Sequence, residues 1–199
     1  MQSISESCKN QSMPFNLPIF LTWLRVALVP LLVCIFYLPQ SWMSLYAQSL
    51  TAGIIFIVAA VTDWIDGYLA RKWNQTSAFG AFLDPVADKL IVAGSLIVLV
   101  QLGRVSAILA FIIIGREIAI SALREWMAKI GESNSVAVSS LGKVKTIAQM
   151  IAIPMLLYYD NLFYVIDTRF IGTYLLIIAA FLTVVSMLYY LRKALPLIK

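Results

Sequence analysis

The chain has 199 residues, of which 61% are hydrophobic and 13% are charged, and its mean hydropathy is +0.89. Soluble domains carry about 25% charged residues, so this balance excludes an ordinary soluble globule and indicates an integral membrane protein. The net charge of +5 comes from basic residues spread over loops and helix ends. This distribution suits anionic membrane surfaces and phosphorylated substrates, and we expect no nucleic-acid partner.

The chain begins with a polar leader, residues 1–15, that lacks the basic start and apolar core of a cleavable signal peptide. Residues 13–20 are too broken by proline to span a membrane, and they predict a short interfacial helix. Six candidate spans follow, and all are predicted as helices because barrel strands would show short alternating segments. We therefore expect residues 16–199 to form one all-α, six-helix membrane domain. The candidate spans cover residues 20–38, 46–70, 81–102, 105–128, 143–160 and 170–191.

The basic residues of the loops are distributed unequally between the two sides of these spans. With six spans, both termini share one side, and only Arg104 and Arg169 fall on the opposite side. Positively charged loops stay in the cytoplasm. The asymmetry therefore predicts cytoplasmic termini and a cytoplasmic connection between the second and third spans.

Four aspartates lie at that connection: Asp63 and Asp66 in the second span, and Asp84 and Asp88 in the third. Carboxylates at the edge of a membrane helix cost free energy, so a functional role is the first explanation to consider for them. Asp63 and Asp66 are three residues apart and share a helical face, and Asp84 and Asp88 are four apart. Ion pairs with neighbouring basic residues could account for any two of these aspartates, but they do not account well for all four. Two acidic stripes facing each other can hold one or two hard cations, and oxygen-only ligands favour Mg²⁺ or Mn²⁺ over zinc.

Small residues accompany these acids. Gly67 and Ala70 lie on the face of Asp63, so a flat base or ribose could approach the backbone there. Arg71 at the helix end can bind a phosphate bidentately. Gly80 would allow the same close approach of a ligand to the backbone of the third span. Metal ions at this place would polarise a diphosphate in phosphoryl transfer. The chain has no histidine, and Asp88 is the best candidate to take a proton from an attacking hydroxyl.

Together these residues resemble the signature of the CDP-alcohol phosphatidyltransferase family, D-x2-D-G-x2-A-R-x8-G-x3-D-x3-D, with all eight fixed positions present. The resemblance implies a six-helix enzyme of the bacterial cytoplasmic (inner) membrane, usually a homodimer, with two metal ions and a CDP-lipid donor. It also implies roles for individual residues. Asp63, Asp66, Asp84 and Asp88 would be metal ligands, Asp88 also the base, and Asp66, Gly67, Ala70, Arg71 and Gly80 would bind CDP.

Further polar and basic residues lie toward the same side of the other spans. They are Thr22 and Arg25 in the first span, Arg116 and Arg124 in the fourth, and Lys143 and Lys145 in the fifth. An arginine within a span needs a partner, and the neighbouring Glu117 points elsewhere on the helical wheel, so an anionic substrate group is the better match. A basic pocket beside a diphosphate site favours glycerol 3-phosphate over free serine, choline or inositol. The alternatives are pairing of the arginines with Glu117 or lipid phosphates, and lysines that extend to anionic headgroups.

The resemblance extends from Asn16 to Tyr190 and is greatest to the branch of the family that uses glycerol 3-phosphate. We therefore expect direct phosphatidyl transfer from CDP-diacylglycerol to sn-glycerol 3-phosphate, with release of CMP. Other acceptors within the family remain open, as do a divalent-cation transporter and a membrane prenyltransferase. Against a transporter, the acids cluster toward one membrane face.

Overall fold

The structure is a computed structural model that describes residues 17–73, 78–130, 140–162 and 165–194, although some side chains near helix ends are outside the description. The described residues form six α-helices, each corresponding to one predicted span to within about four residues. The all-α membrane class is therefore confirmed. The elements are α1 (Leu17–Cys34), η1 (Ile35–Tyr37), α2 (Leu45–Trp73), α3 (Ala78–Gln101), α4 (Ala107–Lys129), α5 (Ser140–Tyr158), β1 (Asn161–Leu162), β2 (Ile166–Asp167) and α6 (Thr168–Ala194).

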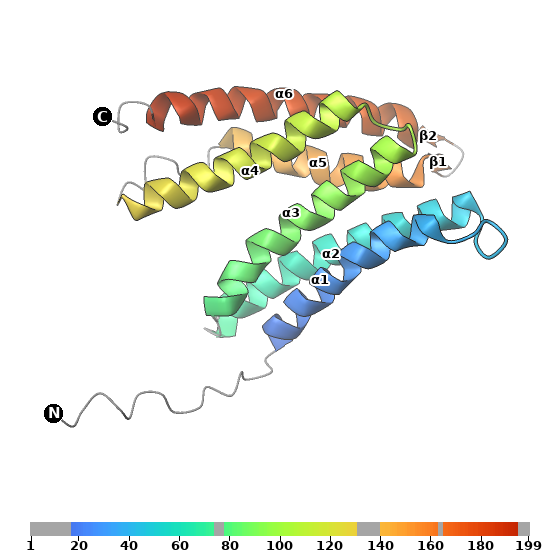
Figure 1. Cartoon of the computed structure of the whole chain (residues 1–199), viewed down its shortest axis with the longest axis horizontal. Coiled ribbons are helices and arrows are strands. Elements are labelled where there is room, and N and C mark those ends of the chain that lie inside the picture. Colours follow the sequence, from blue (N-terminus) through green and yellow to red (C-terminus); the bar gives the residue numbers. More distant parts are fainter. Residues whose placement is uncertain (1–16, 74–77, 131–139, 163–164, 195–199) are drawn as a thin grey trace.

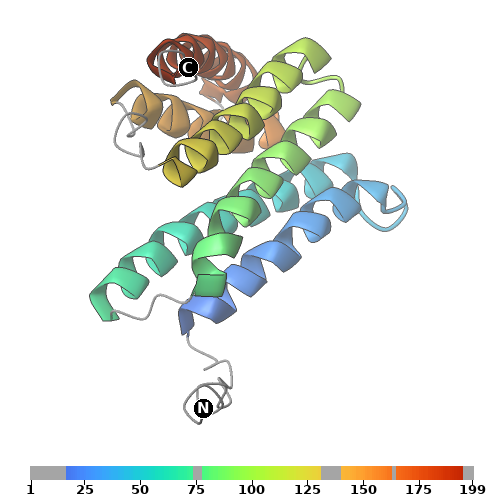
Figure 2. The same cartoon turned by 60° about the vertical axis from the view of Figure 1, so that its left-hand side comes forward.

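Successive helices run in opposite directions, so the bundle has two distinct ends (Figure 1). We call the end where α2 finishes and α3 begins the carboxylate end, and the end with β1 and β2 the hairpin end. The start of α1, the start of α5 and the end of α6 lie toward the carboxylate end, and the turn between α3 and α4 lies at the hairpin end (Figures 1 and 2). Within the bundle, α5 packs against both α6 and α2, and α1 packs against α2 and α3.

Within the part of the chain that the structure describes, three helices are long and apolar enough to cross a membrane by length and composition alone. Their candidate spans are Phe20–Tyr37, Leu45–Ile65 and Thr168–Arg192, and α5 contains a shorter apolar stretch, Val144–Tyr158. Helices α3 and α4, with 24 and 23 residues, also have spanning length. Both carry ionisable residues that the sequence singled out, among them Asp88 in α3 and Arg116 in α4.

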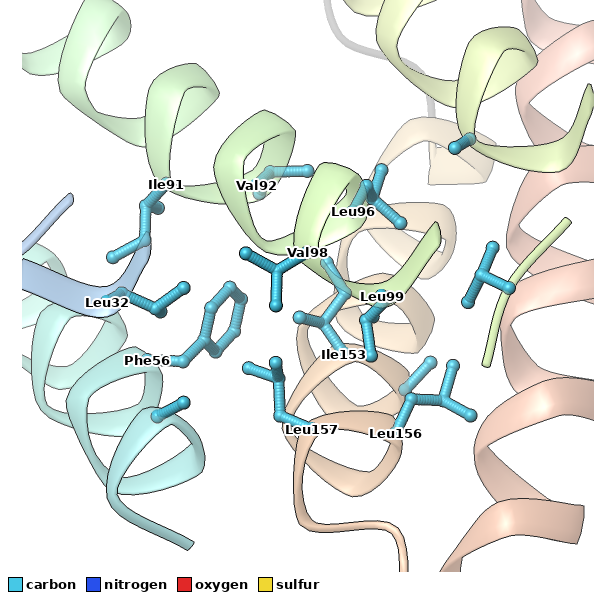
Figure 3. Close-up of a cluster of buried hydrophobic side chains, with 14 of the residues drawn as sticks. Leu32, Phe56, Ile91, Val92, Leu96, Val98, Leu99, Ile153, Leu156 and Leu157 are labelled. Atoms are coloured by element: carbon cyan, nitrogen blue, oxygen red, sulfur yellow. The ribbon is translucent and has the colours of Figure 1, made fainter. Parts of the chain in front are cut away.

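The main hydrophobic core fills the space between α1, α2, α3 and α5 (Figure 3). Leu32 of α1 and Phe56 of α2 meet Leu99 of α3 and Leu157 of α5, and each of these four side chains is at most 1% exposed. Tight packing of this kind fixes how the four helices lie relative to one another. It therefore determines which side chains meet at the carboxylate end.

A glycine allows α6 to approach α5 closely. A Cβ added at Gly172 would lie 2.9 Å from Cγ of Leu156 and 3.3 Å from the carbonyl oxygen of Ala152. No side chain fits at that distance unless one helix moves. Gly115 of α4 differs, because an added Cβ there meets nothing within 4 Å.

Two features differ from the sequence predictions. Helix α1 begins at Leu17, so residues 17–20 belong to the first helix and not to a separate interfacial one. Pro18 lies in the first turn, where the missing N–H removes no helical hydrogen bond. The leader, residues 1–15, lies outside the described residues. The second feature is the antiparallel pair of β1 and β2, in which Asn161 is opposite Asp167. Strands of two residues are too short to show the alternation of polar and apolar residues by which a strand is predicted.

Candidate active site

Asp63 and Asp88 come from different helices and share one electrostatic neighbourhood. Asp63 lies in the last third of α2, and its Oδ1 is 2.5 Å from Nη1 of Arg25 on α1. Arg25 is 1% exposed, whereas Asp63 is 44% exposed. Asp88 of α3 lies within electrostatic reach of both. Three helices therefore bring two carboxylates and one buried cation together.

The other residues of the acidic signature lie in the last turns of α2 and the first turns of α3. Both segments are helical, so Asp66 follows Asp63 by three helical positions and Asp84 precedes Asp88 by four. The side chains of Asp66, Gly67, Ala70, Arg71, Gly80 and Asp84 lie outside the described residues. The CDP-binding strip and the full set of metal ligands therefore stay predictions.

The described acidic groups fit a hard divalent cation in their chemistry. Asp63 and Asp88 offer carboxylate oxygens, which are the ligands that Mg²⁺ and Mn²⁺ prefer. Among the described side chains, no three acidic, histidine or cysteine groups lie close enough to form a metal site. Asp63 and Asp88 are therefore compatible with the predicted metal site, and the other two predicted ligands are those whose side chains are not described.

A cavity of about 500 Å³ lies between α3, α4 and α5, with Asp88 in its wall. Four cations line it, Lys89, Arg116, Arg124 and Lys145, and the anionic groups in the lining are Asp88 and Glu117. Four positive charges against two negative ones leave a formal charge of +2. The uncharged lining residues are Pro85, Val92, Ile120, Ser121, Thr146, Gln149 and Met150.

Hydrogen bonds and ion pairs connect the cations of this cavity. Lys145 of α5 forms an ion pair with Glu117 of α4, and Nη1 of Arg116 lies 3.5 Å from the same carboxylate. Nη2 of Arg116 donates to Oγ of Ser186 on α6 at 2.8 Å. The helical wheel had suggested that Glu117 points away from Arg116, and this was wrong. The glutamate side chain is long enough for its carboxylate to lie between Arg116 and Lys145 of another helix.

The predicted acceptor-binding residues fall into three groups. Arg116, Arg124 and Lys145 line the cavity that contains Asp88. Thr22 and Arg25, both buried on α1, are not among its lining residues, and Arg25 instead pairs with Asp63. The side chain of Lys143 lies outside the described residues.

Sequence reasoning missed several residues of this site. Lys89, Thr146 and Gln149 line the cavity without having been assigned to it. Lys89 is adjacent to Asp88, and Gln149 lies one helical turn after Lys145, so helical spacing could have identified both. Ser186 had no such signal. It lies about 70 residues from Arg116 in the chain, and only the packing of α6 on α4 brings the two together.

An apolar groove between α2 and α5 leads away from Asp63. Its first part, about 390 Å³, is lined by Asp63, Trp64 and Met150 together with Phe56, Ile57, Ala60 and Val61. Its second part, about 480 Å³, shares Ile57 and Met150 and continues to Tyr158 and Thr168 near the hairpin end. Met150 also lines the cavity with the four cations. The groove and the cavity are therefore neighbours on the two sides of α5.

A helical bundle with carboxylates of two helices beside a cationic cavity and an apolar groove fits a membrane enzyme that acts on a phosphorylated lipid. The family model for CDP-alcohol phosphatidyltransferase matches residues 15–185, and the chain belongs to this family. Enzymes of the family generally use a divalent metal ion.

Several curated relatives are closely similar to this chain over nearly their whole length. Proteins from Escherichia coli (strain K12), Shigella boydii serotype 4 (strain Sb227) and Shigella flexneri serotype 5b (strain 8401) are each 50% identical to it over 184 residues. The match covers 92% of this chain and 96% of each relative. All three are named CDP-diacylglycerol–glycerol-3-phosphate 3-phosphatidyltransferase.

Proposed function

We propose that this protein transfers the phosphatidyl group of CDP-diacylglycerol to sn-glycerol 3-phosphate, which gives phosphatidylglycerophosphate and CMP. The observation that carries the proposal is the cavity in which Asp88 shares a wall with four cations. A phosphomonoester is dianionic near neutral pH, and the formal charge of +2 on the cavity lining complements it. Relatives at 50% identity carry the name of the same reaction.

Acceptor binding would use the cations of α4 and α5. Arg116, Arg124 and Lys145 would hold the phosphate, with Lys89 completing the positive lining. Arginine is suited to this role because its planar guanidinium can bind two phosphate oxygens at once. A phosphate held there leaves the glycerol hydroxyls to reach toward Asp88. A free alcohol such as serine or inositol would leave these cations without an anionic ligand.

The transfer itself would be a direct displacement. Asp88 accepts the proton of the 1-hydroxyl as that oxygen attacks the lipid-side phosphorus of CDP-diacylglycerol. A new P–O bond forms, the P–O bond to CMP breaks, and CMP leaves. Asp63, Asp66, Asp84 and Asp88 would hold two divalent ions, Mg²⁺ or Mn²⁺, and these would neutralise charge on the diphosphate. Arg71, with Asp66, Gly67, Ala70 and Gly80, would bind the CDP group.

The lipid chains of the donor would occupy the apolar groove between α2 and α5. The groove starts at Asp63, where the diphosphate would bind, and runs toward the hairpin end along Ile57, Pro154 and Tyr158. The acyl chains would pass from the hydrocarbon of the bilayer into an equally apolar groove, so the groove would position the donor without a large gain in hydrophobic free energy. The neighbouring cavity stays polar, so donor tails and phosphorylated acceptor would bind on different sides of α5.

We further propose that the carboxylate end faces the cytoplasm of a bacterium and that the enzyme acts as a homodimer in its membrane. The excess of basic residues at that end supports the orientation. The dimer rests on the family resemblance. Chemical cross-linking in membranes would test the dimer, and labelling of single cysteines introduced at each end would test the orientation.

The experiment that tests the function measures CMP release by the purified protein with CDP-diacylglycerol and Mg²⁺. We expect release only when glycerol 3-phosphate is also present, and none with serine or inositol in its place. Release with inositol phosphate but not glycerol 3-phosphate would contradict the acceptor assignment and keep the family chemistry. Absence of release with every alcohol, together with metal uptake into proteoliposomes, would contradict the enzyme and favour a transporter.

A further inference from the structure

Helix α6 contributes a hydrogen-bonding partner to Arg116 of the cationic cavity, through Ser186. Oγ of Ser186 lies 2.8 Å from Nη2 of Arg116, and Ser186 is 1% exposed. The same hydroxyl donates its proton to the carbonyl oxygen of Thr183 at 2.9 Å. A hydroxyl has a single proton, so this bond fixes the Oγ lone pairs in the direction of Arg116. Ser186 is thereby an oriented acceptor.

The guanidinium of Arg116 is held at two of its three nitrogens. Nη2 is bound to Ser186, Nη1 faces Glu117 at 3.5 Å, and Nε has no hydrogen-bond partner among the described residues. Because the guanidinium is planar, two fixed nitrogens determine the plane of the whole group. Arg116 lines the cavity that contains Asp88, so this plane decides how the cation meets an anion there.

Glu117 alone cannot fix this orientation. Its carboxylate also pairs with Lys145, and 3.5 Å from Nη1 of Arg116 is a loose contact. Ser186 is attached to a different helix, and it gives the shorter of the two contacts. Loss of its hydroxyl would leave Arg116 charged and in place but free to rotate about its last bonds.

We propose that Ser186 is a positioning residue that sets the orientation of Arg116 for binding the phosphate of the acceptor. The inference rests on the proposed function, since it names a residue that serves the acceptor site of that reaction. Removing a hydrogen bond to a charged group costs more than removing one between neutral groups. Part of that loss would weaken the binding of the acceptor phosphate by Arg116, and we expect a roughly five- to thirtyfold rise in the KM for glycerol 3-phosphate.

The test compares Ser186→Ala with a matched control, Ser95→Ala. Ser95 of α3 is also fully buried, and its hydroxyl donates to the carbonyl oxygen of Ile91 in its own helix at 2.7 Å. The two substitutions therefore remove the same group from the same kind of environment, and they differ in the contact with Arg116. We expect Ser186→Ala to raise the KM for glycerol 3-phosphate, with kcat and the KM for CDP-diacylglycerol within about twofold of the original protein. Ser95→Ala should change none of the three.

A double-substitution cycle shows whether Ser186 acts through Arg116. In an Arg116→Gln background, Ser186→Ala should add less than twofold to the KM for glycerol 3-phosphate, because the group it orients is gone. If Ser186→Ala does not fold, Ser186→Cys nearly keeps the volume and offers only a weak sulfur acceptor, so it should raise the same KM.

Three outcomes would overturn the inference: an unchanged KM for glycerol 3-phosphate, an equal rise in both KM values, or a full additional effect in the Arg116→Gln background. Failure of the proposed function would be visible separately. In that case the unsubstituted protein would release no CMP with glycerol 3-phosphate, whereas failure of the Ser186 inference alone would leave release by the unsubstituted protein dependent on glycerol 3-phosphate.

Discussion

The bundle contains two arginines in contrasting surroundings, the half-buried Arg104 at the hairpin end and the buried Arg116 beside the cavity. Nη1 of Arg104 donates to the carbonyl oxygens of Leu156 and Leu157 at 3.2 and 2.5 Å, and Nη2 donates to Oγ of Ser49 at 2.8 Å. Its guanidinium also lies 4.5 Å from the centre of the Tyr159 ring. These partners are the last carbonyls of α5 and a side chain of α2, so Arg104 joins three parts of the chain.

Arg116 is the better buried of the two, but fewer of its donors are used within the protein. It has Ser186 and Glu117 as partners, an Nε without a hydrogen bond among the described residues, and a cavity in front of it. Arg124, which lines the same cavity, also has an Nε without such a partner. The difference teaches that burial of an arginine does not by itself indicate function. A cation whose donors are used within the protein holds helices together, whereas one that faces a cavity with donors to spare is placed for a ligand.

The electrostatics of Arg104 agree with a structural role. Burial lowers the pKa of its guanidinium from the ordinary value, yet an arginine stays protonated at any pH near neutrality. Its charge interacts favourably with the carbonyl groups at the C-terminal end of α5, where backbone acceptors lack helical partners. Arg104 therefore acts as a side-chain cap for α5.

The largest expected effect comes from comparing an aspartate at the carboxylate end with an aspartate at the hairpin end. We expect Asp88→Asn to lower the rate of CMP release about 10²- to 10⁴-fold, because the amide cannot take the proton of the acceptor hydroxyl. The matched control is Asp160→Asn at the hairpin end, an aspartate that is 46% exposed and 4.0 Å from Arg169; it should keep nearly full activity. Steady-state assays of both variants measure this. A rate for Asp88→Asn within tenfold of the original would contradict the role of base.

The second effect concerns Arg104 and the fold. Arg104→Met keeps an unbranched apolar side chain and removes the donors to α5 and Ser49, and we expect a loss of about 2–4 kcal/mol of stability. The KM for glycerol 3-phosphate should not change in protein that is still folded. Thermal unfolding in detergent, followed by circular dichroism, measures the first quantity. A stable Arg104→Met with a raised KM would contradict the division between the two arginines.

The third effect concerns Arg124 and the acceptor. Arg124→Gln removes one of the four cations of the cavity, and we expect the KM for glycerol 3-phosphate to rise about tenfold with little change in the unfolding temperature. Arg169→Gln is the control, because Arg169 is an exposed arginine at the hairpin end. Kinetics at saturating CDP-diacylglycerol measure both variants. Equal KM values for the two would mean that the cavity does not bind the phosphate.

The smallest effect tests packing by means of two helical glycines. Gly172→Ala would place a methyl group 2.9 Å from Cγ of Leu156, and we expect a loss of about 1–3 kcal/mol. Gly115→Ala meets nothing within 4 Å and should stabilise α4 by about 1 kcal/mol through helix propensity. Unfolding in a denaturing detergent compares them. A marked loss at Gly115 would indicate a neighbour from a second copy of the chain at that face.

The sequence by itself determined the class of the protein and the helices that build it. Six apolar stretches at spanning length are local properties of the chain, because each helix satisfies its own backbone hydrogen bonds in a membrane. The helical spacing of Asp63 and Asp66, and of Asp84 and Asp88, is local in the same sense, so the acidic signature and its chemistry could be predicted. The grouping of Arg116, Arg124 and Lys145 could also be predicted, since all three lie toward one side of the membrane.

Contacts between helices could not be predicted from the sequence, because they depend on how far each helix rotates and tilts when its side chains pack. Only the tertiary structure placed Arg25 on Asp63, turned Glu117 toward Lys145, and brought Ser186 of α6 to Arg116 of α4. The sequence already placed Arg104 in a loop on the opposite side and Arg116 within the fourth span. Only the tertiary structure showed that other parts of the chain use the donors of Arg104, whereas a cavity lies in front of Arg116.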